Sequence, residues 1–534
     1  MAHLILAPIL LPLVSAAVLL LLGEQRRRLR SALGILASLA GLVVSIIILW
    51  RVDQTGRIAV YLASNWEAPI GIVLVADRLS ALMLVLTSIV GVCAALHAQA
   101  AWSRVGVYFH PLFQVQLMGL SGAFLTGDLF NLFVFFEVML AASYGLQLHG
   151  SGLPRVRSGL HYIAVNLLAS ALFLIGLAVL YGVLGTLNMA DIAAKLPLVP
   201  TQDRGLLHAC VAILAVAFLI KAAIWPLNAW LVPAYTAATA PVAALFAVMT
   251  KVGIYTLLRL WTLFFSGDIG PSAHFGQSFL LYGGLATIMV GAIGMLTTLR
   301  IDRIASYAIM VSSGTLLAAI GMGTIAVTSA ALFYMLSATV AVSALFLLVE
   351  LIERIGSNPT STASALDLLP GEDTNLDDEQ APLVGRVFPI SIAVLALAFM
   401  VCALLVAGLP PLSGFLAKLS LLTSVLDENV PATGWVFFGV LLVAGFAATV
   451  SFARAGIRNL WATGRRSAPP LNAAEAGAVV ALLATCLLLT VFAEPVLRYT
   501  RATAEQLHGP QSYVESVLST DARPRPSSDQ ETGR

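Results

Sequence analysis

The sequence contains 534 residues, of which 59% are hydrophobic and only 10% are charged, with a formal net charge of +2. Soluble domains carry about 25% charged residues, so this composition excludes a soluble globular protein and indicates a membrane protein. The basic residues are dispersed or lie at the ends of apolar runs, which excludes a nucleic-acid-binding surface. The four cysteines each lie alone inside an apolar run, so we expect neither disulfides nor a zinc site.

Apolar runs of about 20 residues predict membrane-spanning helices. We expect about fourteen of them, at residues 4–22, 31–50, 78–98, 111–126, 128–147, 160–183, 206–228, 242–263, 279–299, 304–325, 328–350, 387–425, 434–455 and 472–492. The predicted fold class is therefore an all-α polytopic membrane protein. The run 387–425 is too long for one straight span and contains Gly408-Leu409-Pro410-Pro411, which predicts a broken helix. Trp225-Pro226 predicts a second broken helix.

Basic residues predict how the chain is oriented. No positive charge precedes the first apolar run and Arg26, Arg27, Arg28 and Arg30 follow it, which is typical of a retained helix rather than a cleaved signal peptide. If the N-terminus is outside, fifteen arginines fall in inner loops and five lysines and arginines in outer loops. This bias toward the inside predicts that both chain termini lie outside.

Three segments outside the spans have a distinct composition. Apolar alternation around Pro69 and Gly71 predicts a short outer hairpin. Residues 357–385 are polar and acidic without a basic residue, which predicts a flexible cytoplasmic linker between two halves. The part of the C-terminal tail up to about Leu518 fits short amphipathic helices, and residues 519–534 are polar.

We single out four ionisable residues within the predicted spans: Glu137, Lys221, Lys251 and Lys418. One charge at the centre of a membrane helix costs on the order of 2.5–3.5 kcal/mol on insertion scales. Such groups are expected to pair with one another or to form an ion pathway. A movable Glu137–Lys221 pair would let Lys221 hold or release a proton, depending on how close the carboxylate lies.

Two of the lysines share a local design. Lys221 precedes the Pro226 break by about one turn, and Lys418 follows the break at Gly408. A broken helix frees backbone carbonyls and admits water. One such lysine in each half predicts two five-helix repeats, which must be inverted relative to each other because their helix count is odd.

The repeats predict how the chain is divided. The division is into residues 1–105 with three helices and the outer hairpin, 106–265 as the first repeat, 266–465 as the second repeat with the acidic loop 357–385, and 466–534 with the last helix and the tail.

Several motifs carry a resemblance that covers nearly the whole chain. It resembles the antiporter-like subunits shared by respiratory complex I and the Mrp-type multisubunit cation/proton antiporters, and is most similar to the D-subunit family of the Mrp type. The motifs are Gly127–Glu137 with Ser143-Tyr144, the hairpin residues Trp66, Pro69, Gly71 and Asp77, Lys221 with Trp225–Leu231, Ala240-Pro241-Val242, Lys251-Val252-Gly253, Asp302–Tyr307, Gly408–Lys418, and Tyr513-Val514 with Val517-Leu518.

The resemblance implies roles for the four ionisable residues. Glu137 and Lys221 would be a coupling pair, Lys251 a central relay and Lys418 the terminal lysine of a hydrated proton pathway. The chain would be a secondary transporter subunit rather than an enzyme, and it would need no cofactor and no metal. It would exchange H⁺ for Na⁺, with K⁺ or Li⁺ as alternatives, among other membrane subunits and lipids of the bacterial inner (cell) membrane.

Two other functions stay open. One is a proton-pumping subunit of complex I or of a membrane-bound hydrogenase, in which redox chemistry elsewhere drives the same fold. The other is a structural subunit that keeps the charges without conducting. Neither alternative requires a nucleotide, flavin or iron–sulfur motif in this chain, so the lack of such motifs does not separate them.

The eleventh predicted span departs from many relatives, which carry a His or Lys there. This span offers only hydroxyls, at Tyr334, Ser337, Thr339 and Ser343. Proton passage from Lys251 to Lys418 would therefore use these hydroxyls, water or another helix. Hydroxyls in membrane helices commonly bond to their own backbone instead.

Overall fold

The computed structural model describes residues 2–22, 26–100, 108–150, 152–265, 272–356, 390–426, 432–461 and 471–520. The linker predicted at 357–385 and the tail beyond residue 520 lie outside these ranges. The helices are α1 (Ala7–Leu21), α2 (Arg27–Thr55), α3 (Arg78–Ala98), α4 (Phe109–Leu125), α5 (Leu129–Gln147), α6 (Leu153–Leu184), α7 (Met189–Lys195), α8 (Arg204–Lys221), α9 (Leu231–Ala237), α10 (Ala240–Phe264), α11 (Gln277–Thr297), α12 (Ile301–Met322), α13 (Ile325–Glu353), α15 (Ile390–Ala407), α16 (Ser413–Val425), α17 (Ala432–Gly456), α18 (Ala473–Val491), α19 (Ala493–His508) and α20 (Pro510–Leu518).

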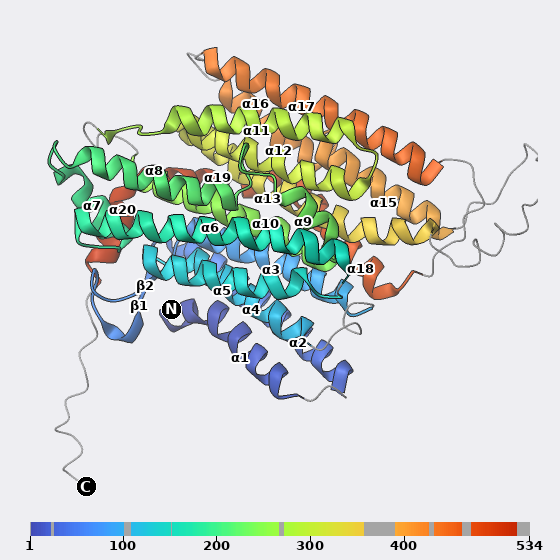
Figure 1. The fold of residues 1–534 in the computed structure, drawn as a ribbon, viewed down its shortest axis with the longest axis horizontal. Helices are drawn as coiled ribbons and strands as arrows, with labels where there is room; N and C mark the ends of the chain where they lie inside the picture. The colour runs from blue at the N-terminus through green and yellow to red at the C-terminus, as the bar shows by residue number, and fades with distance from the viewer. Residues whose placement is uncertain are drawn as a thin grey trace, which may run out of the picture.

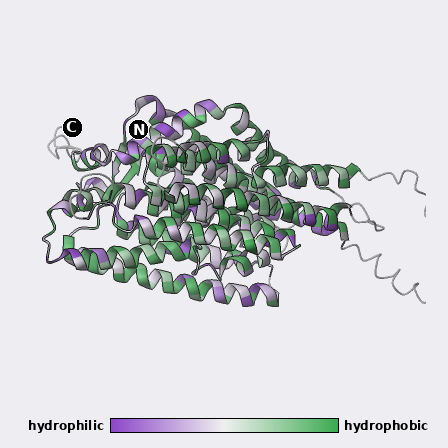
Figure 2. Ribbon diagram, turned by 90° about the horizontal axis from the view of Figure 1, so that it is seen from above, coloured by the Kyte–Doolittle hydropathy of each residue, from purple (hydrophilic) through white to green (hydrophobic). Residues whose placement is uncertain are grey.

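The predicted all-α polytopic membrane fold is confirmed. In the described parts of the chain, thirteen helices are long and apolar enough to cross a membrane. α4, with 17 residues, occupies the position of the remaining predicted span. Figure 2 shows hydrophobic residues along most of the length of the helices, as expected for helices that cross a membrane.

The helices lie side by side, with α1 and α2 at one edge of the bundle and α16 and α17 at the opposite edge (Figure 1). α10, α12 and α13 form the interior. The most apolar part of α10 is completely buried and those of α12 and α13 are 94% buried, against 33% for α1. A polar side chain on α10 is therefore surrounded by protein rather than by lipid.

A β-hairpin covers one end of the bundle. β1 (Ala59–Leu62) pairs antiparallel with β2 (Val73–Ala76), with Ala59 opposite Ala76, which confirms the predicted hairpin. Asp77 then caps α3: its carboxylate accepts the Ser80 backbone N–H at 2.9 Å, and the Ser80 hydroxyl accepts the Asp77 N–H at 2.9 Å. This capping box fixes the direction in which α3 leaves the hairpin.

The C-terminal tail forms two helices that pack on the chain itself. α20 contacts α7 and β1, and α19 contacts α13 and α3. The Tyr499 hydroxyl donates to the Arg78 carbonyl at 2.9 Å. The first described residues also lie here, since the His3 ring contacts Tyr61. We call this end of the bundle the hairpin side, and the end where α13 stops and α15 starts the linker side.

A buried ion pair joins the hairpin to the interior. Arg259 lies within the span predicted at 242–263 and is a further ionisable residue, beyond the four identified from the sequence. Its guanidinium holds the Asp77 carboxylate with two hydrogen bonds, one of them 2.8 Å long. The two side chains are 7% and 2% exposed. The rings of Tyr255 and Tyr513 lie 5.5 and 5.4 Å from the guanidinium, so this pair also anchors α20.

Replacing Asp77 by alanine is expected to lower the free energy of unfolding by about 3–5 kcal/mol, because it leaves the Arg259 charge buried and uncompensated. Thermal unfolding of the detergent-purified protein measures this. Glu494→Ala, which breaks an exposed pair with Arg498, serves as the control and should leave the unfolding temperature unchanged. An Asp77→Ala protein as stable as the parent would show that the pair is not a structural anchor.

Candidate functional site

Glu137 and Lys221 are brought together by a third residue, Ser170. Glu137 lies on α5, Ser170 on α6 and Lys221 at the end of α8. The Ser170 hydroxyl donates a short hydrogen bond to the Glu137 carboxylate, and the Lys221 Nζ donates to the Ser170 Oγ at 3.4 Å. No ion pair within 4.0 Å joins the two charged groups directly in the described structure. The hydroxyl therefore lies between carboxylate and amine.

Lys221 is the last residue of α8, so the span predicted to run to residue 228 ends seven residues earlier. Ala223 has φ of 54°, a left-handed conformation that no helix continues, and Pro226 follows. The Ile220 carbonyl, in the last turn of α8, accepts the Trp230 indole N–H at 3.0 Å as well as the Ala223 backbone N–H. The predicted break is confirmed, and it places a lysine at the negative end of a helix dipole, which favours a cation.

Lys251 lies on α10 at the centre of the bundle and is 1% exposed. Its Nζ donates to two hydroxyls of α12, Ser312 at 2.8 Å and Ser313 at 3.2 Å. These two serines were not among the site residues predicted from the sequence. The sequence shows two adjacent serines in an apolar run. Nothing in the neighbouring residues indicates that they face a lysine 61 residues earlier in the chain.

Lys418 lies on α16, beside the second break. Its Nζ donates to the carbonyls of Val406 and Ala407, at 3.1 and 2.7 Å. These carbonyls are at the C-terminal end of α15, where the helix stops and Gly408 takes a left-handed φ of 78°. The predicted broken helix is thus confirmed, and its loose carbonyls are the acceptors for the lysine.

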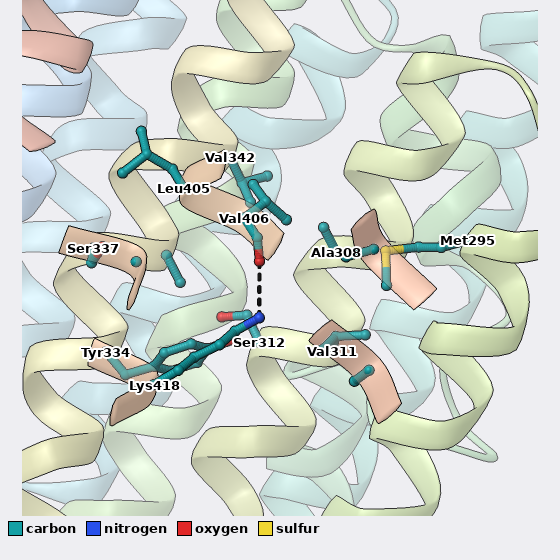
Figure 3. A pocket seen from close by; sticks show the side chains of 14 residues that line it. Met295, Ala308, Val311, Ser312, Tyr334, Ser337, Val342, Leu405, Val406 and Lys418 are labelled. Atoms are coloured by element: carbon teal, nitrogen blue, oxygen red, sulfur yellow. Dashed lines mark hydrogen bonds between the residues drawn. The ribbon is translucent and has the colours of Figure 1, made fainter. Parts of the chain in front are cut away.

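A cavity lies beside Lys418 and is also lined by Ser312 (Figure 3), which accepts a hydrogen bond from Lys251. Ser312, Tyr334, Ser337 and Lys418 are its polar lining side chains, and apolar residues of α11, α12, α13, α15 and α17 complete it. About 20 Å³ of it is open to the centre of a water molecule, and roughly 10–15 Å³ on this measure holds one water. The cavity is therefore large enough for a single water molecule.

The four hydroxyls predicted on the eleventh span, which is α13, separate into two groups. Tyr334 and Ser337 line the cavity, and Ser337 is 2.9 Å from Ser413 of α16. Thr339 donates to the Met335 carbonyl of its own helix at 2.6 Å. Ser343 donates to the Ala244 carbonyl at 3.0 Å and so ties α13 to α10. The structure brings only the first two to Lys418.

The assembled groups are ones that can take up and release protons. Within the described residues, no group of three or more His, Cys, Asp or Glu is placed to bind a metal. Three amines and one carboxylate can each take up and release a proton, and the hydroxyls beside them can donate and accept at once. Buried ionisable groups next to broken helices mark the class of membrane proteins that pass ions.

The chain belongs to the NADH:quinone oxidoreductase/Mrp antiporter transmembrane family, whose model matches residues 126–445. It is 49% identical over 528 residues to the D-type subunit of a probable K⁺/H⁺ antiporter of Rhizobium meliloti, covering 97% of this chain and 98% of the relative. It is 35% identical over 525 residues to the D-type subunit of the Na⁺/H⁺ antiporter of Alkalihalophilus pseudofirmus, covering 97% and 100%. A chain of the Mrp complex from Dietzia sp. has the same fold, with a TM-score of 0.82 and 26% identity over 97% of this chain and all of that chain.

Substituting Gly408 by alanine is expected to destabilise the protein by about 1 kcal/mol or more, because its backbone is left-handed. The new Cβ would also clash with the Lys418 Cδ and would push the lysine off its carbonyls. Gly439→Ala is the matched control, since a Cβ there meets nothing within 4 Å. Unfolding temperatures of the two variants measure the difference, and equal values would contradict the strain at Gly408.

Proposed function

We propose that this chain is the proton-carrying subunit of a multisubunit antiporter that exchanges protons for a monovalent cation. The observation that carries the proposal is the series of three buried lysines, each bonded to a hydroxyl or to freed carbonyls. A lysine placed in this way is neither locked by a carboxylate nor left without an acceptor. It can therefore exchange a proton at modest cost, which a permanently charged arginine cannot do.

The proposed pathway uses the four residues singled out from the sequence. Glu137 and Lys221 exchange a proton through Ser170, Lys251 is the central carrier and Lys418 the terminal one. Tyr334 and Ser337 are accessory groups because they line the cavity beside Lys418. Thr339 and Ser343 have a structural role, because their hydroxyls donate hydrogen bonds to backbone carbonyls.

We infer that the cation and part of the pathway involve other subunits. The relatives are named as subunits of K⁺/H⁺ and Na⁺/H⁺ antiporters, which supports K⁺ or Na⁺ as the exchanged ion, with Li⁺ as a further alternative. Glu137 is only half-buried in the isolated chain, although it lies midway along a membrane helix. Lipid is a costly surrounding for a carboxylate, so a neighbouring membrane subunit that covers it is expected.

The orientation and the repeats are part of the same proposal. The Lys and Arg bias supports a hairpin side that faces outward from the bacterial inner membrane, with both termini there. Residues 106–265 and 266–465 would be the inverted repeats, between the segment 1–105 and the segment 466–534. In support, the fourth helix of each repeat, α8–α9 and α15–α16, is the broken one and carries or adjoins a lysine.

The alternative is a proton-pumping subunit of a complex I-like oxidoreductase or hydrogenase, because the matching family includes NADH:quinone oxidoreductase chains. Purifying the protein from its native membrane separates the two. Small membrane subunits without redox proteins support the antiporter, whereas flavin and iron–sulfur subunits in the same complex support the pump.

Lys251→Ala is expected to abolish cation-driven proton movement in vesicles that contain the assembled complex, because the central carrier is lost. Glu137→Gln and Lys221→Ala should have the same effect. Each variant must be compared at equal amounts of assembled complex, measured by co-purification of its subunits. Normal proton and cation fluxes in these variants would contradict the proposed pathway.

Ser170→Ala is expected to reduce the exchange rate about tenfold or more, because the carboxylate and the amine lose the hydroxyl between them. Ser158→Ala is the matched control, since it lies on the same helix and its hydroxyl donates to the Pro154 carbonyl of α6. Equal rates for the two variants would mean that Ser170 only supports the helix.

A further inference from the structure

The stretch from Lys251 to Lys418 is the part of the pathway that the sequence left open, because α13 offers no amine, imidazole or carboxylate there. We infer that Ser312 of α12 relays the proton between the two lysines, with one water molecule in the cavity completing the path. This inference rests on the proposed function. The relay would lie on α12, which packs against α13, the helix that has no amine, imidazole or carboxylate at this level.

Ser312 lies at the junction of two polar environments. On one side its Oγ accepts a hydrogen bond from the Lys251 Nζ at 2.8 Å. On the other side it lines the cavity that also contains Lys418 (Figure 3). The Tyr334 hydroxyl lies close to Ser312 and Thr315. Ser312 is thus in contact with Lys251 and also faces the space next to Lys418.

The cavity can hold and orient one water molecule. A buried water is stable when it has two to four polar partners. The hydroxyls of Ser312 and Tyr334 line the space, together with the Lys418 amine and the Val406 residue whose carbonyl that amine contacts. A water there would donate to or accept from groups on both sides, and so would link Ser312 to Lys418.

The transfer balances without any other reactant. Protonated Lys251 gives a proton to the Ser312 oxygen while the serine O–H proton passes to the water, and the water gives one of its protons to neutral Lys418. One N–H bond breaks at Lys251 and one forms at Lys418, and no electrons are transferred. The new ammonium on Lys418 then donates to the carbonyls of Val406 and Ala407, which stabilise the charge.

Ser313 provides the comparison that distinguishes a relay from a simple anchor. It also accepts a hydrogen bond from the Lys251 Nζ, at 3.2 Å, but it is not among the residues that line the cavity. An anchoring role predicts similar effects when either hydroxyl is removed. A relay role predicts that removing the Ser312 hydroxyl slows proton transfer more than removing the Ser313 hydroxyl.

The experiment compares Ser312→Ala, Ser313→Ala and Ser312→Thr in the full complex, with cation-driven proton movement measured in vesicles at equal amounts of assembled complex. Ser312→Ala should slow exchange about tenfold or more and clearly more than Ser313→Ala, which removes an acceptor of Lys251 but no group that lines the cavity. Ser312→Thr should retain the relay hydroxyl and the activity. Equal rates for Ser312→Ala and Ser313→Ala would overturn the inference.

Lys251→Ala is run alongside as the reference. If Lys251→Ala abolishes exchange and Ser312→Ala does not, the relay is wrong and the proposed function stands. If both variants exchange normally, the proposed function itself fails.

Filling the cavity tests the water separately. Ala338 lines the cavity and is partly exposed, so valine can be accommodated there while its methyl groups take the space of the water. Ala338→Val should slow exchange with both Lys251–serine hydrogen bonds intact. An assembled Ala338→Val complex with normal exchange would overturn the water step.

Discussion

An amine inside a membrane needs an oxygen acceptor at every position it takes, and this requirement explains much of the interior. A central charge costs on the order of 2.5–3.5 kcal/mol on insertion scales. Ser170 is the acceptor for Lys221, and Ser312 and Ser313 are the acceptors for Lys251. The carbonyls at the C-terminal end of α15 are the acceptors for Lys418. The helix breaks and the interior serines therefore supply the oxygen acceptors that the buried lysines need.

The type of acceptor decides what each cation can do. Arg259 is held by the Asp77 carboxylate with two hydrogen bonds and remains charged, so it serves as an anchor between the hairpin, α10 and α20. The lysines contact hydroxyls and carbonyls instead. A hydroxyl can pass a proton onward, whereas a carbonyl can only stabilise the charge that arrives. This difference supports transfer through Ser170 and Ser312 and a resting position at Lys418.

The sequence predicted what depends on local composition. The spans follow from apolar length, the breaks from Pro226 and Gly408, and Glu137, Lys221, Lys251 and Lys418 are conspicuous because charges are rare in such runs. Contacts between distant segments were not predictable. Ser170 and Ser312 look like any membrane serine, which commonly bonds its own backbone as Thr339 does. Asp77 and Arg259 are 182 residues apart, and the early end of α8 depends on the backbone of Ala223.

In the proposed function, a cation gradient drives protons along this buried line without redox chemistry. The most direct measurement reconstitutes the purified complex in sealed vesicles and records the internal pH when a K⁺ or Na⁺ gradient is imposed with no electron donor present. The gradient alone should move protons in the opposite direction to the cation. An internal pH that changes only when an electron donor and acceptor are supplied would contradict it.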